Sequence, residues 1–214
     1  MTDTTALPAD PLPFDRDADV RVRIVSAVIV AFRTRAFHET SPEVVADVAG
    51  LSVEAVRREF PSWDGLVMAA VDRWNAERMR PVVPLLHAHG AVRFLRGIVE
   101  QNVQDPSLMR LLTSLLNVAA TPDHPMGPTL QHEWQKFHAL VQAGLAADVA
   151  AGREPATMQP VRGAEQLIAL YEGLQLQSMV RPSMDLLASY DRAVTRLRAG
   201  WSQDYVEHVW DLDA

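Results

Sequence analysis

The chain has 214 residues, of which 48% are hydrophobic and 22% charged, the composition of an ordinary globular protein. Its net charge of −7 excludes a molecule attracted to nucleic acid as a whole, so any DNA affinity has to come from a local patch. The chain contains no cysteine, which excludes disulfides, a thiol nucleophile and cysteine-ligated zinc. No apolar run approaches the ~20 residues of a membrane span and no secretory pattern opens the chain, so we expect a cytoplasmic protein without a membrane partner.

The first predicted elements are an arm and a helix. Residues 1–14 contain several prolines and little that could pack, so we expect a disordered arm. Apolar residues at three- and four-residue spacing, among them Ile24, Val28 and Phe32, then predict one buried face of a helix.

Two short helices joined by a tight turn follow. Ser41 can cap the first of them, and Pro42 suits its first helical position. This helix ends at Gly50, where glycine can take a positive φ, and Ser52 starts the next helix at once. Two short helices joined by a glycine-containing turn have the geometry of a helix-turn-helix, whose second helix lies in the DNA major groove.

Residue types, order and spacing in this region resemble the DNA-binding domain of the TetR family of transcriptional regulators. The matching positions are Phe37, His38, Glu39, Thr40, Ser41, Val45, Ala46, Ala49, Gly50, Leu51, Ser52, Phe60, Ser62, Asp64 and Leu66. A later tract resembles actinobacterial C-terminal domains of that family. The resemblance implies an all-α fold. An N-terminal three-helix helix-turn-helix domain would cover 15–62, a C-terminal helical ligand-binding and dimerisation domain 63–203, and a tail 204–214.

The resemblance also implies where DNA is contacted. The implied positions are Arg23, Thr40, Ser41, Ser52, Val53, Glu54, Arg57, Arg58 and Trp63. Three of them, and Glu59 beside them, depart from the family pattern. Arg57 replaces a tyrosine and can grip phosphate with two hydrogen bonds, whereas Trp63 replaces a lysine and offers only its backbone N–H. Glu54 and Glu59 would repel phosphate, although a carboxylate can also accept from cytosine N4.

The charge balance of this region leaves two interpretations open. Between Asp15 and Phe60 there are seven arginines and eight acidic residues, which is not the basic stripe typical of DNA binders. The main interpretation is a DNA reader with an altered operator. The alternative is a helical ligand-binding or protein-interaction module whose helix-turn-helix no longer binds DNA.

The rest of the chain has a helical pattern throughout. We expect a linker helix to about Arg80, ended by Pro81 and Pro84. Further helices are predicted at about 90–104, 106–120, 127–151, 160–181 and 184–203. Aromatic and polar residues on the middle helices suit a pocket for an apolar ligand of medium size, although each is also compatible with simple core packing. The candidate pocket residues are Phe94, Asn102, Met109, Trp134, His138, Tyr171 and Gln175.

The last two predicted helices carry apolar stripes. The candidate interface residues are Leu167, Leu174, Ser178, Leu187, Tyr190, Val194, Leu197 and Trp201. Such stripes can face the core of their own chain, but the resemblance implies a homodimer formed by these helices. A two-fold dimer would set two recognition helices ~34 Å apart on a palindromic site. Val194→Asp together with Leu197→Asp is therefore predicted to disrupt assembly.

Catalytic and metal-binding patterns are absent from the sequence. His87 and His89 alternate, but no carboxylate completes a ligand set at usable spacing, so no metal or other cofactor is expected. No phosphate-binding loop or nucleophile elbow occurs, and nothing recommends an enzyme. We expect a ligand-responsive repressor that binds a double-stranded DNA operator as a homodimer and is released by a small-molecule effector.

Overall fold

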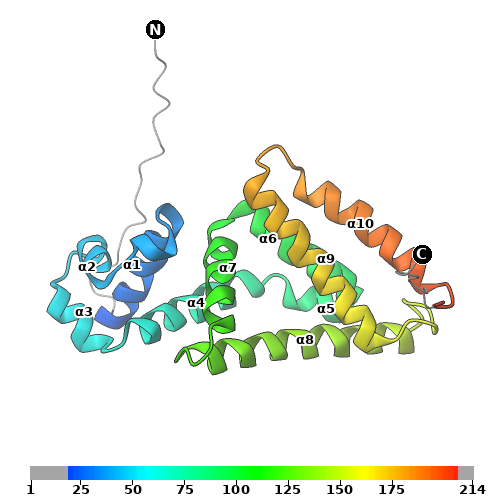
Figure 1. The fold of residues 1–214 in the computed structure, drawn as a ribbon, viewed down its shortest axis with the longest axis horizontal. Helices are drawn as coiled ribbons and strands as arrows, with labels where there is room; N and C mark the ends of the chain where they lie inside the picture. Colours follow the sequence, from blue (N-terminus) through cyan, green and yellow to red (C-terminus); the bar gives the residue numbers. More distant parts are fainter. Residues whose placement is uncertain (1–18, 207–214) are drawn as a thin grey trace, which may run out of the picture. The chain divides into compact units, whose positions relative to one another are not determined.

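The computed structural model describes residues 19–206, and across that range the chain is all-α, as predicted (Figure 1). The predicted arm, 1–14, lies outside the described residues, as does most of the predicted tail. The chain divides into two compact units, Met1–Asp72 and Arg73–Ala214.

The division between the units falls inside helix α4 (Trp63–Met79), ten residues beyond the expected boundary at 62/63. The first half of α4 belongs to the helix-turn-helix unit. It contributes Leu66, Val67 and Ala70, none of which is more than 1% exposed. These buried residues explain why the compact unit extends past the start of the helix.

The first unit is built around a small apolar core. Its other elements are α1 (Val20–Thr34), the short 3-10 helix η1 (Phe37–Glu39), α2 (Pro42–Ala49) and α3 (Val53–Glu59). Ile24, Val28 and Phe32 of α1 are buried, together with Val45 of α2 and Val56 of α3. The predicted inner face of α1 is confirmed.

The predicted helix ends of the helix-turn-helix are also confirmed. The Ser41 hydroxyl accepts the third amide N–H of its helix at 3.4 Å, and the Ser52 hydroxyl does the same at 3.2 Å. Gly50 ends α2 with φ 61° and ψ 42°, the left-handed conformation that glycine adopts without strain. The reversal between α2 and α3 is therefore fixed by local chemistry.

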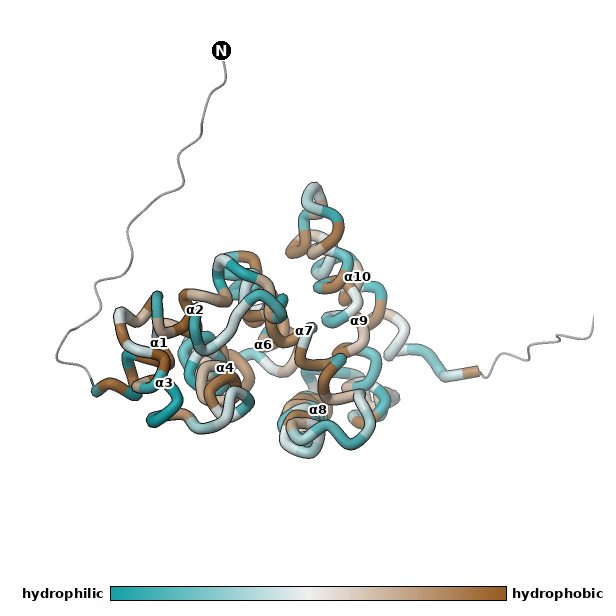
Figure 2. The backbone as a smooth tube through the Cα atoms, turned by 60° about the vertical axis from the view of Figure 1, so that its left-hand side comes forward, coloured by the Kyte–Doolittle hydropathy of each residue, from teal (hydrophilic) through white to brown (hydrophobic). Residues whose placement is uncertain are grey.

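The second unit is a helical bundle. Besides the end of α4 it contains α5 (Val83–His89), α6 (Ala91–Gln104), α7 (Ser107–Ala120), α8 (Gly127–Ala150), α9 (Pro160–Val180) and α10 (Leu186–Trp201). Helices α9 and α10 lie side by side, and α6 packs against both of them and against α8 (Figure 1). Hydrophobic and hydrophilic stretches alternate along the helices, so each contributes one side to the core (Figure 2).

Helix α5 was not predicted. Pro81 and Pro84 suggested the end of a helix, but Pro84 lies in the first turn of α5, where its missing N–H would have no helical partner. Gly90 ends α5 with φ 88° and ψ 178°.

Gly90 is held against a buried carboxylate. A Cβ atom on Gly90 would lie 2.4 Å from Asp148 Oδ1. Asp148 is 2% exposed; its Oδ2 accepts the N–H of Ala91 at 2.7 Å, and its Oδ1 accepts from Arg153 Nε at 2.7 Å. Asp148 therefore caps the N-terminus of α6 from a distant helix, an arrangement that only glycine at position 90 permits.

Candidate functional site

Helix α3 presents its polar side to solvent. Ser52, Glu54, Arg57 and Arg58 are exposed, and Val53 is half-buried. All five belong to the predicted DNA-binding residues. They lie at the second helix of the motif, where their side chains are at least partly accessible. A helix-turn-helix contacts bases with this part of its recognition helix.

Arg57 is paired within the unit rather than free. Its Nη2 donates to Glu43 Oε1 at 2.8 Å, and both side chains are more than half exposed, so the pair contributes little to stability. A hydrogen bond from its own backbone amide and one from Ser41 lower the pKa of Glu43, and Arg57 adds to the effect. The pKa of Glu54 is lowered in the same way, through its own backbone amide and Ser52. Both carboxylates are therefore charged beside the exposed side of α3.

Arg23 holds the turn together. Its Nε and Nη2 donate to the carbonyl oxygen of Ala49 at 3.0 and 2.8 Å, and Nη2 also donates to that of Gly50 at 3.1 Å. These are the orphan carbonyls at the end of α2, where a cation is favourable. Arg23 was predicted to contact DNA. The structure assigns this side chain to the C-terminus of α2 instead.

Arg23→Met is expected to lower the free energy of unfolding of the first unit by about 1–2 kcal/mol, because it removes charge-assisted hydrogen bonds at a helix end. Amide hydrogen exchange in α2 and α3 measures this loss. Arg58→Met, which removes an arginine that is 70% exposed, should leave exchange unchanged. Equal protection in both variants would contradict the capping role.

The side chains of Thr40 and Trp63 pack inside the first unit. Thr40 is 6% exposed, and its hydroxyl donates to the carbonyl oxygen of Ala36 at 3.0 Å. Trp63 is half-buried, with its ring centroid 6.4 Å from that of Phe32. The buried Thr40 side chain is therefore not placed to contact DNA, contrary to the sequence-based expectation, and the Trp63 ring has a packing role.

Arg21 caps the C-terminal end of α3. Its Nη1 donates to the carbonyl oxygen of Glu59 at 2.7 Å, and its guanidinium carbon lies 4.1 Å from the centroid of the Phe60 ring. This role was not predicted, because Arg21 lies 38 residues from Glu59 in the sequence. Arg21 and Arg23 are both engaged at helix ends, and Arg57 and Arg58 are the basic residues on the outer side of α3.

Four of the seven predicted pocket residues come together inside the second unit. Asn102 lies at the centre: Oδ1 accepts from Arg78 Nη1 at 2.7 Å, while Nδ2 donates to the Tyr171 hydroxyl at 3.0 Å and to Gln175 Oε1 at 3.1 Å. The sulfur of Met109 accepts from the Tyr171 hydroxyl and from Arg78 Nη1, both at 3.4 Å. Asn102, Tyr171 and Gln175 are each at most 3% exposed. A buried polar network of this kind is unusual for a core that only packs.

Arg78 is the member of this network that the sequence analysis missed, because it lies in the segment predicted as a linker helix. Its Nη2 donates to Asn75 Oδ1 at 2.7 Å. The residue as a whole is half-buried, but its Nε is closed off from solvent and has no hydrogen-bond partner. Among residues 19–206 no ion pair includes Arg78. Burial lowers the pKa of Arg78, but guanidinium is the most basic side chain in proteins and stays protonated.

Aromatic rings lead from α8 to this network. The ring centroids of Trp134 and Phe137 are 6.0 Å apart in an edge-to-face arrangement, and those of Phe137 and Tyr171 are 6.4 Å apart. Trp134, Phe137 and His138 are half-buried. Phe94 is fully buried in the hydrophobic core. Of the predicted pocket residues, Trp134 and Tyr171 are thus linked through Phe137, which was not predicted.

The predicted interface stripe faces the core of its own chain. Four of its members are buried in that core: Leu167, Tyr190, Val194 and Trp201. Three more are partly buried and pack against it: Leu174, Leu187 and Leu197. The Tyr190 hydroxyl donates to the carbonyl oxygen of Val92 at 3.2 Å, and the Ser178 hydroxyl to that of Gln175 at 2.7 Å. The heptad-like spacing is explained by the fold of one chain.

This finding corrects the assembly test that the sequence suggested. Val194→Asp with Leu197→Asp would place charge in the core and unfold the unit, whatever its oligomeric state. The outer side of α9 instead exposes Val161, Leu176 and Val180, which are 53%, 48% and 78% exposed. These three residues are more exposed than the stripe, of which Leu174, Ser178, Leu187 and Leu197 are half-buried.

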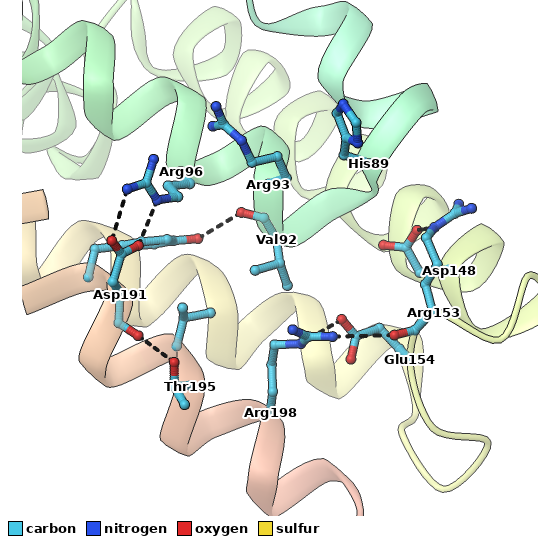
Figure 3. Close-up of a pocket in the computed structure, with 12 residues that line it drawn as sticks. His89, Val92, Arg93, Arg96, Asp148, Arg153, Glu154, Asp191, Thr195 and Arg198 are labelled. Carbon is cyan, nitrogen blue, oxygen red and sulfur yellow. Dashed lines mark hydrogen bonds and ion pairs between the residues drawn. The ribbon is translucent and has the colours of Figure 1, made fainter. Parts of the chain in front are cut away.

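A cavity of about 540 Å³ lies beside α6, α10 and the loop after α8 (Figure 3). Its charged side chains are largely paired with one another: Arg96 with Asp191, Arg153 with Asp148, and Arg198 with Glu154. The hydrogen bond from Arg96 holds the pKa of Asp191 below its usual range. The pairs tie α10 to α6 and to the loop, and the loop to α8, which gives this cavity a structural role.

No group of three or more His, Asp or Glu side chains within residues 19–206 is placed to hold a metal ion. Among the described helices, none is long and apolar enough to cross a membrane.

Several solved transcriptional regulators have a similar fold. A regulator from Rhodococcus sp. Rha1 is 19% identical, with 87% of this chain and 99% of that one covered and a TM-score of 0.69. SmeT, the repressor of the Stenotrophomonas maltophilia multidrug efflux pump SmeDEF, is 19% identical over 90% and 96% of the two chains, with a TM-score of 0.66. FadR of Thermus thermophilus, a TetR family transcriptional repressor solved with lauroyl-CoA, is 21% identical over 88% and 98%, with a TM-score of 0.59.

No protein-family model and no curated protein sequence matches the chain. At these low identities the structural likeness establishes the fold. The protein has the TetR-type fold, with an N-terminal helix-turn-helix and a C-terminal helical domain.

Proposed function

We propose that this protein is a TetR-type transcriptional regulator that binds a double-stranded DNA operator as a homodimer and releases it when a small-molecule effector binds the second unit. The observation that carries the proposal is the helix-turn-helix itself. Helix α3 is capped by Ser52, exposes Arg57 and Arg58, and follows a turn fixed by Gly50. Nothing in the first unit covers this side of α3 within the described residues.

Binding to DNA would exchange one partner of Arg57 for another. In the free protein the guanidinium is paired with Glu43 at 2.8 Å. A phosphate offers two oxygens to the same fork and a stronger charge, so it can displace an exposed carboxylate. This exchange explains how a region with balanced charge can still bind DNA.

The second unit supports the effector half of the proposal. A polar network around Asn102 lies inside an apolar core, and half-buried aromatic residues of α8 lead toward it. The related fold of FadR was solved with lauroyl-CoA and that of SmeT with triclosan. An effector that binds one conformation of the dimer better than the DNA-bound one shifts the population and lowers operator affinity.

A mobility-shift assay on the DNA upstream of the protein's own gene tests the function. A retarded complex that disappears in excess unlabelled operator supports a regulator. Its absence there would favour a helical ligand-binding or interaction module, an alternative consistent with the pairing of Arg57 by Glu43.

Two single substitutions in the reading surface should have opposite effects. Arg57→Ala is expected to weaken binding nearly uniformly across operator sequences and to lower the salt slope by about one unit, because it removes a phosphate contact. Glu43→Gln should tighten binding, most visibly at low salt, because it frees Arg57 and removes a charge that repels phosphate. Titrations at two salt concentrations measure both effects, with Glu77→Gln as an exposed control in the second unit. Unchanged affinity in both variants would exclude Arg57 as a DNA contact.

A further inference from the structure

The second unit contains a cation without a counter-charge. Arg78 reaches three acceptors, Asn75 Oδ1 at 2.7 Å, Asn102 Oδ1 at 2.7 Å and Met109 Sδ at 3.4 Å, and all three are neutral. Its Nε has no partner and no access to solvent. Burying a charged group without an opposite charge is strongly unfavourable, so an unpaired guanidinium here calls for a functional reason.

Nearby carboxylates do not supply the missing charge. Glu77 precedes Arg78 in the chain, but its Oε1 accepts from Arg73 Nε at 3.1 Å. Glu172 follows Tyr171 on α9, and it is half-buried with a pKa raised by desolvation. Among the ion pairs of residues 19–206, none joins Arg78 to Glu77 or to Glu172. The other side chains of this hydrogen-bonded network are uncharged: Asn75, Asn102, Met109, Tyr171 and Gln175.

We propose that Arg78 binds the carboxylate of the effector, which we infer to be an apolar acid. This inference rests on the proposed function and specifies the chemical class of its effector. The Nε of Arg78 has no partner, and Nη2 donates to the neutral Asn75 Oδ1. These two nitrogens form a fork that matches the two oxygens of a carboxylate, which would replace Asn75 as the acceptor of Nη2. A phosphate, with three oxygens and a larger charge, would require more donors than this neutral, methionine-containing surrounding provides.

The surroundings of Arg78 fit the apolar part of such a ligand. Tyr171, whose hydroxyl belongs to the network, is followed outward by the rings of Phe137 and Trp134 at centroid distances of 6.4 and 6.0 Å. The thioether of Met109 lines the same network, and methionine adapts its shape to different apolar groups. Arg78 could pair with the carboxylate of a ligand, and the neighbouring aromatic rings could pack against the apolar part of the same ligand.

Matched acids and amides test the proposal without knowledge of the natural effector. Octanoate and octanamide, and 4-phenylbutyrate and its amide, differ in charge while their apolar parts are the same. Isothermal titration of the full chain should show that at least one acid binds about tenfold or more tightly than its amide. Arg78→Gln should abolish this preference, while Arg80→Gln, at an exposed position two residues further on, should retain it.

Thermal melting of the same variants separates binding from folding. Arg78→Gln should melt at the temperature of the parent or above it, because an unpaired buried charge is removed. Asn102→Asp places a carboxylate where Oδ1 now lies, 2.7 Å from Arg78 Nη1, and should raise the melting temperature and abolish acid binding.

Equal binding of acid and amide, a preference that persists in Arg78→Gln, or no binding by either acid would each overturn the proposal. So would a lower melting temperature of Arg78→Gln together with an unaltered one for Asn102→Asp. A mobility shift on operator DNA is measured separately with each variant. Its absence for the parent protein would count against the proposed function, whereas the comparison of acid with amide decides the anion site.

Discussion

Replacing Gly90 by alanine is expected to lower the free energy of unfolding of the second unit by about 3–5 kcal/mol. The backbone there has φ 88° and ψ 178°, a region that is essentially restricted to glycine and costs other residues about 1–3 kcal/mol. The added Cβ would lie 2.4 Å from Asp148 Oδ1, and overpacking of this kind costs about 1–3 kcal/mol. Movement of Asp148 would also break its hydrogen bond to the N–H of Ala91.

Differential scanning calorimetry should show this loss as a fall of about 10 °C in the melting temperature. Gly200→Ala is the matched control, because that glycine lies in α10 and its Cβ would meet nothing within 4 Å. Asp148→Ala combined with Gly90→Ala should destabilise by less than the sum of the two, because both changes remove the same cap. A melting temperature of Gly90→Ala within a degree or two of the parent would contradict the role assigned to this contact.

Leu176→Asp together with Val180→Asp is expected to yield a folded monomer that binds the operator about 100-fold or more weakly. Both side chains are exposed on α9, 48% and 78%, so they can be replaced without disturbing the core. At a two-fold interface the introduced aspartates of one subunit would lie close to the same aspartates of the other, so their charges would repel and remain unpaired. The loss of affinity follows because a dimer gains avidity from binding two half-sites together.

Light scattering combined with circular dichroism measures the assembly and the fold of the same sample. Val103→Asp changes a comparably exposed valine on α6, 54% exposed, and should leave a dimer. If the Leu176 and Val180 variant remained dimeric with full affinity, the outer face of α9 would not be the interface.

The features that sequence reasoning predicted correctly depend on local chemistry. Ser41, Gly50 and Ser52 act on amides and dihedral angles within a few residues, so their roles can be read from neighbouring positions. The helices of the second unit were placed to within a few residues for the same reason, since apolar spacing and proline positions mark them. Helix α5 was not predicted, because a proline can mark either the end of one helix or the first turn of the next.

The features that were missed depend on partners distant in the sequence. Arg21 and Arg23 lie 38 and 26 residues from the carbonyl groups that they cap, and nothing beside them in the sequence indicates those partners. Arg78 meets Asn102 across 24 residues, from a segment that the pattern suggested was only a connection. The stripe through Tyr190 and Val194 has the same spacing whether it faces a partner or its own core, so only the tertiary structure distinguishes the two.

Selection of bound sequences from random double-stranded DNA tests the central claim most directly. The account predicts that the parent protein enriches a palindrome whose half-sites are centred about one helical turn apart, ~34 Å, or a multiple of that distance. The variant with Arg57→Ala and Arg58→Ala should enrich nothing under the same conditions. No enriched sequence for the parent, or the same sequence enriched by the variant, would contradict the assignment of α3 as a DNA-reading helix.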